Sequence, residues 1–368
     1  DLEMPDSGGG NDRLIVEAVQ KGEIEEAVLD QAVARILTII FRYVDHRDES
    51  AQFDREKHHE AAREAACQSM VLLKNDAMAD GSRLLPLKKG GRYAFIGSFA
   101  KEPRYQGGGS SHINAYRVTN ALKECAGYGV IRFAEGFAAE QDVTDAAKLA
   151  EAVQAAKESD AAVIFAGLPE SIESEAYDRD HMRLPACQNE LIRAVVSVQP
   201  NTVVVLHNGS PVEMPWAEQV PAILESYLAG EAVGEAQAAL LFGERNPCGK
   251  LAETFPLRVQ DNPAWLDFGG RKDVVHYGEG IFVGYRYYDT KEMPVLFPFG
   301  HGLGYTEFAY DDLRFDRESL CGEETLEIRF RIRNTGDREG SEAPQVYVHM
   351  KNSGISRARQ ELKGFEKV

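Results

Sequence analysis

The sequence predicts an α/β protein: a mostly parallel α/β sandwich of five to six strands, followed by a partial antiparallel β-sandwich. Short, nearly all-apolar runs such as 161–165 and 202–206 alternate with segments of helical periodicity. That alternation is typical of parallel strands buried on both faces. Beyond residue 308 the pattern changes to alternating apolar and polar residues, as in 326–332, which is typical of half-buried antiparallel strands.

The amino-acid composition of the chain disfavours some classes of binding partner. The 368 residues hold 41 Lys plus Arg against 59 Asp plus Glu, a formal charge of −18, which disfavours nucleic acids and anionic membrane surfaces. No apolar run approaches the ~18 residues of a membrane span. The five cysteines are widely spaced without a C-x-x-C pair, which disfavours a zinc knuckle or disulfide framework and favours a reducing compartment, so we expect a cytoplasmic location.

Residues 1–50 are expected to form two amphipathic helices and a linker. Apolar residues recur at helical spacing from Leu14 to Val19 and from Ile24 to Ile40. Such a segment has too little apolar surface to fold alone, so we expect it to be the end of a larger domain. The chain begins at Asp1 without a signal-peptide pattern, and we expect the natural protein to be longer at both ends.

Residues 51–256 are expected to form the α/β sandwich domain. We expect its helices near residues 56–66, 119–125, 146–158, 188–198 and 234–241, and its strands near 70–73, 93–96, 130–133, 161–165, 202–206 and 222–224. Residues 257–307 are an aromatic-rich connection without periodicity, and residues 308–368 begin the antiparallel β-sandwich.

Ligands of open α/β sheets bind beyond the carboxyl ends of the strands, so the loops at those ends are the first candidates for a site. The loop 104–114, here called the glycine-rich loop, combines three successive glycines with hydrogen-bonding side chains, which lets its backbone approach a ligand closely. A flexible turn is the alternative. No Gly-Lys-Ser/Thr follows the glycines, so a nucleotide-binding protein is disfavoured.

The segment 170–181, here called the acidic loop, gathers three glutamates, two aspartates, an arginine and a histidine. A carboxylic acid donates a proton near neutral pH only if burial or neighbouring carboxylates raise its pKa, and the cluster supplies such neighbours. The alternative is a solvated loop in which Asp178 and Arg179 cap the next helix. The third loop, 207–216, could bind a hydroxyl-rich ligand or be a plain turn.

Other chemistry has less support in the sequence. Isolated histidines such as His46, His276 and His301 show no metal-ligand spacing, so we expect no metal and no other cofactor. Catalysis by serine is not expected either, because no Gly-x-Ser-x-Gly elbow is present.

Nine short motifs occur in a fixed order along the chain. They are residues 1–5 (DLEMP), 69–75 (SMVLLKN), 84–87 (LLPL), 173–179 (ESEAYDR), 184–185 (LP), 208–213 (NGSPVE), 246–251 (NPCGKL), 284–288 (GYRYY) and 297–306 (FPFGHGLGYT). Together they resemble the motifs of glycoside hydrolase family 3 β-glucosidases over essentially the whole chain.

The resemblance implies three modules and a mechanism. Residues 1–50 would end a (β/α) barrel, residues 51–256 would be an α/β sandwich, and residues 308–368 would begin a fibronectin type III-like domain. The family's retaining mechanism uses an Asp nucleophile on the barrel and a Glu acid/base on the sandwich. The nucleophile belongs to a Ser-Asp-Trp type motif that would precede Asp1.

The resemblance also implies particular site residues. The acid/base motif maps onto residues 173–179, with Glu175 as first choice and Glu173 as second; many relatives have Gly where this chain has Ala176. The glycine-rich loop resembles the family's wall of the sugar site. Its candidate substrate contacts are Arg104, Gln106, Ser110, Ser111 and His112.

The expected function is therefore that of a fragment of a retaining exo-acting β-glycosidase of β-glucosidase type. It would hydrolyse terminal non-reducing β-D-glucosyl residues once combined with a barrel domain of the same or a partner chain, and homo-oligomers are among its expected partners. The alternative, from another class, is a non-catalytic carbohydrate-binding or assembly module. A complete barrel with a Ser-Asp-Trp motif upstream in the same gene would discriminate between them.

Overall fold

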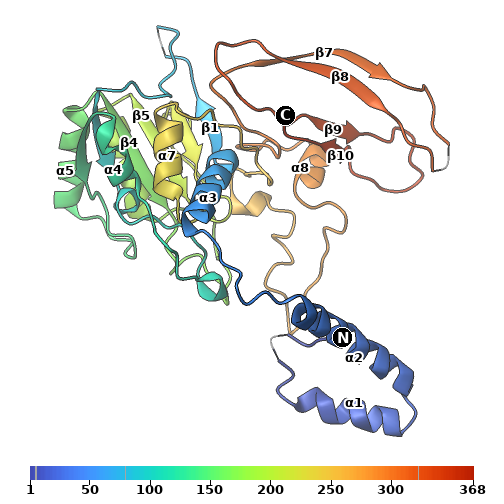
Figure 1. Cartoon of the computed structure of the whole chain (residues 1–368). Coiled ribbons are helices and arrows are strands. Elements are labelled where there is room, and N and C mark those ends of the chain that lie inside the picture. The colour runs from blue at the N-terminus through green and yellow to red at the C-terminus, as the bar shows by residue number, and fades with distance from the viewer. Residues whose placement is uncertain (5, 79, 322) are drawn as a thin grey trace. The chain divides into compact units, whose positions relative to one another are not determined.

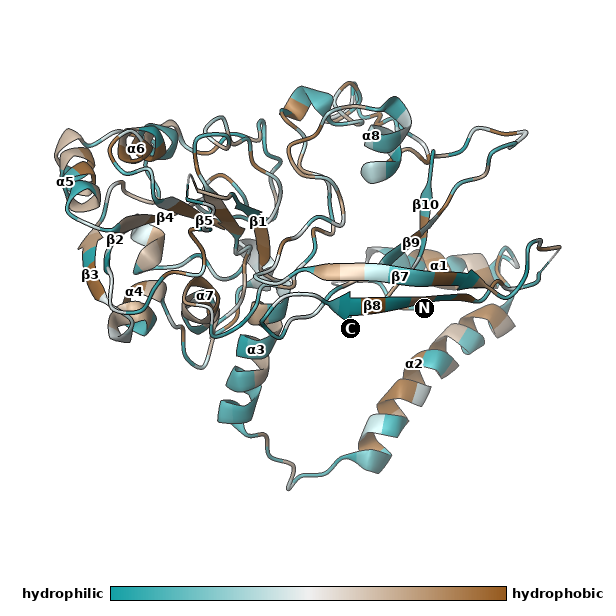
Figure 2. Ribbon diagram, turned by 90° about the horizontal axis from the view of Figure 1, so that it is seen from above, coloured by the Kyte–Doolittle hydropathy of each residue, from teal (hydrophilic) through white to brown (hydrophobic). Residues whose placement is uncertain are grey.

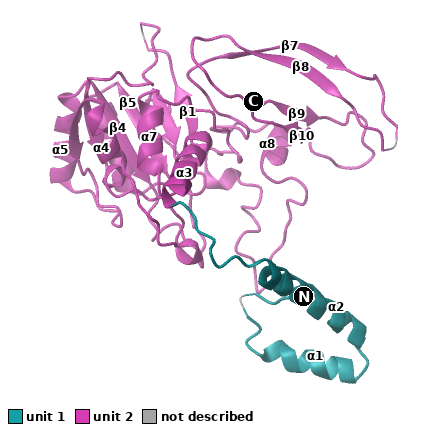
Figure 3. Cartoon of the chain, viewed as in Figure 1, with its two compact units in different colours: residues 1–54 teal, residues 55–368 magenta. Residues whose placement is uncertain are grey.

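The computed structural model describes residues 1–4, 6–78, 80–321 and 323–368; Pro5, Ala79 and Gly322 lie outside the described residues. The chain divides into two compact units, residues 1–54 and residues 55–368 (Figure 3).

Unit 1 consists of two helices, α1 (Gly10–Gln20) and α2 (Glu26–His46), as the periodicity predicts. Neither helix contains a buried residue, although both are amphipathic. Within the unit, Arg35 forms an ion pair with Asp1 at 2.9 Å. The apolar side chains of both helices therefore remain largely exposed.

Unit 2 is built around a six-stranded sheet with the order β1-β6-β5-β4-β2-β3. Figure 1 labels β1, β4 and β5 of this sheet. Every neighbouring pair is parallel except β1 and β6, which are antiparallel. The prediction of a mostly parallel sheet is thus confirmed. The strands are β1 (Val71–Asn75), β2 (Arg92–Ile96), β3 (Val130–Ala134), β4 (Ala161–Gly167), β5 (Thr202–His207) and β6 (Ala222–Glu225).

Helices cover both faces of this sheet. They are α3 (Arg55–Ser69), α4 (Ala121–Glu124), α5 (Ala146–Lys157), α6 (Ala186–Val196) and α7 (Val233–Leu241). Figure 2 shows α5 and α6 on one face and α4 and α7 on the other. Every residue of β4 and β5 is buried, which is why these strands lack the alternation of a strand with one solvated face.

The part of the chain after the sheet contains one helix that the periodicity did not predict, α8 (Tyr285–Lys291). Its seven residues are too few to show a helical repeat. Further on, β7 (Phe308–Phe315) pairs with β8 (Ile328–Asn334), and β9 (Gln345–Val348) pairs with β10 (Glu361–Phe365), both antiparallel. The expected antiparallel strands are therefore present, in two separate two-stranded sheets.

The described parts of the chain contain no helix that is both long and apolar enough to span a membrane.

Candidate functional site

The glycine-rich loop and the acidic loop follow β2 and β4, which are parallel neighbours, and the structure brings the two loops into contact. Each glutamate of the acidic loop contacts a different residue of the glycine-rich loop: Glu170 with His112, Glu173 with Arg104 and Glu175 with Ser110. Residues separated by some 60 positions thus form one cluster at the carboxyl ends of the strands.

Glu173 is the central carboxylate of this cluster, with a side chain that is only 14% exposed. Its Oε2 accepts hydrogen bonds from Arg104 Nη1 and from the backbone amide of Gly209, both at 2.7 Å. Its Oε1 accepts hydrogen bonds from Ser210 Oγ and, at 3.4 Å, from Arg179 Nη1. Burial by itself would raise the pKa of Glu173, but the hydrogen bonds from Ser210, Gly209 and Arg104 outweigh burial and hold that pKa below its usual range. Glu173 therefore joins three loops as an ionised group.

Glu175 has very different surroundings, because its side chain is exposed to solvent. Its Oε2 accepts a hydrogen bond from the backbone amide of Ser110 at 2.6 Å. Hydrogen bonding by the Ser110 hydroxyl, and then by this amide, holds the pKa of Glu175 below its usual range. The next residue, Ala176, has a φ of 77°, a conformation that alanine rarely adopts.

The glycines of the glycine-rich loop have a structural role. Gly109 has a φ of 83°, and a Cβ atom at this position would lie 2.6 Å from the Cβ of Glu175. A Cβ at Gly108 would collide with Ser174. The missing side chains thus let the glycine-rich loop approach the acidic loop, whereas the sequence suggested an approach to a ligand.

The two candidate glutamates differ from expectation in one respect. Clustering predicted that neighbouring carboxylates would raise their pKa values, but in this structure the pKa values of both Glu173 and Glu175 are lowered. That prediction is wrong for this chain, because each carboxylate accepts hydrogen bonds from donors of its own.

The predicted sugar contacts fall into two groups. Arg104 is buried and also donates to the carbonyls of Leu168 and Glu173, so it is held inside the protein. Gln106 accepts a hydrogen bond from the amide of Ile113 at 3.1 Å, which closes its own loop. In contrast, three residues of the same loop are exposed: Ser110, which contacts Glu175, Ser111, and His112, which contacts Glu170.

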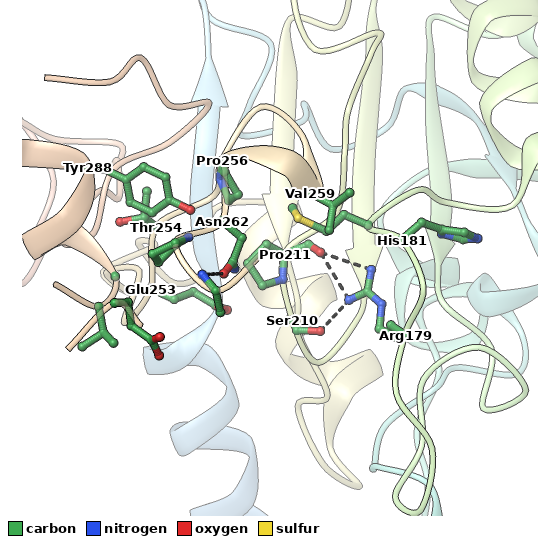
Figure 4. Close-up of a pocket in the computed structure, with 16 residues that line it drawn as sticks. Arg179, His181, Ser210, Pro211, Glu253, Thr254, Pro256, Val259, Asn262 and Tyr288 are labelled. Atoms are coloured by element: carbon green, nitrogen blue, oxygen red, sulfur yellow. Dashed lines mark hydrogen bonds between the residues drawn. The ribbon is translucent and has the colours of Figure 1, made fainter. Parts of the chain in front are cut away.

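Arg179 and Ser210 belong to the site although sequence reasoning did not select them. Arg179 donates to Ser210 Oγ at 2.6 Å and to the carbonyl of Pro211 at 3.3 Å (Figure 4). The suggestion that Asp178 and Arg179 cap the next helix is not supported, because the residue at the N-cap of α6 is Pro185. Arg179 and Ser210 also line a pocket of about 420 Å³ that extends to Glu253.

Two buried ionisable residues lie at the ends of β5 and β6, beneath these loops. Glu225 is fully buried and accepts hydrogen bonds from Asn208 Nδ2 and the amide of Tyr227; burial raises its pKa well above the usual range. His207 is also fully buried, and its Nδ1 lies 3.2 Å from the carbonyl of Arg104. Burial lowers the pKa of His207 to about 4, so the ring is neutral near pH 7.

Among the residues that the structure describes, no group of three or more His, Cys, Asp or Glu side chains is placed to hold a metal ion.

The mostly parallel sheet and the acidic loop lie within one stretch of the chain, residues 70–305. Residues 70–305 match the family model described as the glycosyl hydrolase family 3 C-terminal domain. The chain belongs to glycosyl hydrolase family 3, as its motifs suggest.

Curated relatives agree with this assignment. The chain is 50% identical over 372 residues to the thermostable β-glucosidase B of Acetivibrio thermocellus, covering 100% of this chain and 49% of the relative. It is 40% identical over 379 residues to an exo-α-(1→6)-L-arabinopyranosidase of Bifidobacterium longum, again covering 100% of this chain and 49% of the relative. The chain thus spans about half the length of these relatives.

Solved structures show the same fold. The GH3 β-glucosidase of Bifidobacterium adolescentis matches with a TM-score of 0.92 at 42% identity, over 100% of this chain and 53% of that chain. The β-glucosidase of Kluyveromyces marxianus in complex with glucose matches with a TM-score of 0.86 at 26% identity, over 96% of this chain and 62% of that chain. The predicted fold class is therefore confirmed.

Proposed function

We propose that this chain is the part of a retaining exo-acting β-glucosidase that supplies the acid/base, and that Glu175 is this residue. The complete protein would hydrolyse terminal non-reducing β-D-glucosyl residues. A barrel domain, of the same or a partner chain, would supply the Asp nucleophile from a Ser-Asp-Trp type motif. Family membership and the 50% identity to a β-glucosidase support the reaction class.

One observation carries the choice of residue: the contrast between the two glutamates. A general acid has to reach the oxygen that it protonates. Glu173 is only partly exposed and would have to break ion pairs with Arg104 and Arg179 to do so. Glu175 is exposed at the carboxyl ends of the strands. Within the described residues, its side chain is hydrogen-bonded only to Ser110.

The proposal requires a second domain over Glu175. A proton donor near neutral pH needs a pKa above the ordinary value, and hydrogen bonding by Ser110 lowers that of Glu175 here. A barrel that excludes water from this carboxyl and places an Asp nucleophile nearby would raise the pKa through both desolvation and charge. We assign the two functions, proton donation by Glu175 and anchoring of the loops by Glu173, on this basis.

The predicted substrate contacts divide into residues that would touch the sugar and residues that would only hold the loop. We propose that Ser110, Ser111 and His112 contact the sugar, since all three are exposed in the loop that contacts Glu175. Arg104 and Gln106 would act indirectly by holding the glycine-rich loop in shape.

Glucose is the proposed sugar, because the 50% identical relative is a β-glucosidase. The 40% identical relative is named for its action on L-arabinopyranosides, so the sugar needs its own test. The rates of the complete enzyme on aryl β-D-glucosides and aryl α-L-arabinopyranosides decide between the two sugars.

We also propose a reducing, cytoplasmic location. All five cysteines are free in the structure, which supports it. Mass spectrometry after alkylation of freshly lysed cells tests this location, and sedimentation of the purified protein tests for a homo-oligomer.

The experiment that tests the function uses Glu175→Ala in the complete enzyme. Loss of the acid should slow cellobiose hydrolysis by roughly a hundredfold or more, but slow formation of the glycosyl-enzyme from dinitrophenyl β-glucoside far less, because its leaving group needs little protonation. Added azide should restore turnover by attacking the glycosyl-enzyme without a base.

Glu173→Ala is the matched comparison, two residues away in the same loop. It should reduce activity on both substrates without azide rescue. If Glu173→Ala shows the selective loss and the rescue instead, the two roles are exchanged. If neither variant shows them, the acid/base lies elsewhere and the proposal fails.

A further inference from the structure

His59, in α3, is a buried histidine with a carboxylate at each ring nitrogen. The residue is only 2% exposed. Its Nδ1 lies 2.7 Å from Glu231 Oε1, and its Nε2 lies 3.2 Å from Glu235 Oε2. The ring thus bridges two carboxylates, one in the connection between β6 and α7 and one in the first turn of α7.

Glu231 connects this histidine to the segment that follows the glycine-rich loop. Its Oε2 accepts a hydrogen bond from the amide of Tyr116 at 3.0 Å, and its carbonyl accepts one from the amide of Thr119 at 2.9 Å. Burial by itself would raise the pKa of Glu231, but hydrogen bonds from His59 and from the amides of residues 116 and 117 outweigh burial and lower it. Glu231 is therefore ionised near pH 7.

The glycine-rich loop is attached near both of its ends to the short connection between β6 and α7, which contains Glu231. At the upstream end, the carbonyl of Tyr105 accepts a hydrogen bond from the amide of Gly230 at 2.9 Å. At the downstream end, Tyr116 is held by Glu231. Between these two attachments lies Ser110, whose amide holds Glu175. The position of Ser110 thus depends on a connection that is fixed to α3 through His59.

Further ion pairs connect the elements around the His59 ring. Arg117 is shared between Glu56, at 3.3 Å, and Glu235, at 4.0 Å. Arg63 pairs with Glu60 on α3. These contacts tie α3 to the segment after the glycine-rich loop and to the start of α7.

We propose that His59, held between Glu231 and Glu235, is a positioning residue that fixes the glycine-rich loop against Glu175. The effect of His59 on catalysis rests on the proposed function, whereas its effect on the loop does not.

The first test uses the 368-residue chain and needs no activity. In His59→Gln, whose neutral amide donates to one carboxylate only, the hydrogen-exchange protection of the Ser110, Tyr116 and Thr119 amides should fall by about tenfold. Protection of β4 should not change. His276→Gln, the same substitution at an exposed histidine of unit 2, should leave all of these values unchanged.

A second variant covers the case in which His59→Gln does not fold. In Glu235→Gln the new amide can donate to Nε2, so the ring still donates from Nδ1 to Glu231, and the loop should stay protected. Unchanged exchange in His59→Gln, or a loss of loop protection in Glu235→Gln, would each overturn the inference.

Kinetic measurements on the complete enzyme distinguish failure of this inference from failure of the proposed function. There, His59→Gln should lower kcat for cellobiose with a smaller change in KM, and it should have little further effect when Glu175 is already Ala. A further loss in the Glu175→Ala background as large as in the wild type overturns the positioning role. If Glu175 is not the acid/base, the exchange results still stand, and only the proposed function fails.

Discussion

Glu173 and Glu175 are separated by one residue, yet their carboxylates have opposite surroundings. Glu173 points into the protein, where two arginines and two further hydrogen-bond donors surround it. Glu175 remains exposed and meets only the glycine-rich loop. The sequence supplies two identical side chains here, and the direction of each decides which one can approach a substrate.

Replacing Glu173 tests its anchoring role. Glu173→Gln removes the negative charge between two largely buried guanidinium groups, so the variant should be destabilised by about 3 kcal/mol at pH 7. Because the folded-state pKa of Glu173 is depressed, its stabilisation is present above the ordinary value of 4.5 and is lost as the pH falls through the lower folded-state value. The difference between wild type and variant, measured by urea unfolding, should therefore shrink below pH 4.5.

The control for this measurement is Glu170→Gln. Glu170 lies in the same loop, and its ion pair with His112 is exposed on both sides. This variant should change the free energy of unfolding by less than about 0.5 kcal/mol. Equal effects of the two substitutions would contradict an anchoring role for Glu173.

Ala176 has a backbone conformation that is unfavourable for a residue with a side chain. Its φ of 77° is unfavourable for alanine and costs glycine nothing. Ala176→Gly should therefore stabilise the chain by roughly 0.5–1 kcal/mol despite the added flexibility of the unfolded state. Ala139→Gly, at a loop position whose own φ is not positive, should destabilise by a similar amount, and urea unfolding of both variants distinguishes strain relief from a general effect of glycine.

At the scale of elements, apolar patterning predicted the strands well and the loop contacts poorly. The runs that form β4 and β5 are recognisable because both faces of these strands are buried. Seven-residue α8 was missed, since it is too short to show a repeat. The glycines of the glycine-rich loop indicated a close approach, but only the sheet order places the acidic loop beside them.

Each of the two helices of unit 1 has an exposed apolar face. Leu14 is 55% exposed and Val28 is 58% exposed, and neither helix contains a buried residue. Isolated helices of this length are marginal in water without packing partners. In the 368-residue chain we therefore expect weak hydrogen-exchange protection of α1 and α2, or burial of the Leu14, Val28 and Ile36 face against another chain.

Hydrogen exchange measured over a range of protein concentrations checks this expectation. Protection that grows with concentration indicates burial against another copy. Strong protection in a monomer at low concentration would contradict the expectation.

At the scale of the whole molecule, the chain covers 49% of each of two curated relatives. We expect the nucleophile in the part of the complete protein that this chain does not cover. The 368-residue chain by itself should therefore be inactive towards p-nitrophenyl β-glucoside, because loss of one of two cooperating catalytic groups typically removes several orders of magnitude of activity. Turnover by the highly purified chain at rates ordinary for glycosidases would refute this prediction.

The sequence by itself determined the parallel sheet, the antiparallel strands that follow it and the family, because apolar patterning and short ordered motifs are local properties. It also indicated that the acidic and glycine-rich loops matter. Only the tertiary structure decided that Glu173 is bound by Arg104 and Arg179 while Glu175 stays exposed. The physical reason is that the environment of a carboxylate depends on donors from several loops, and the order of the strands sets which of those loops meet.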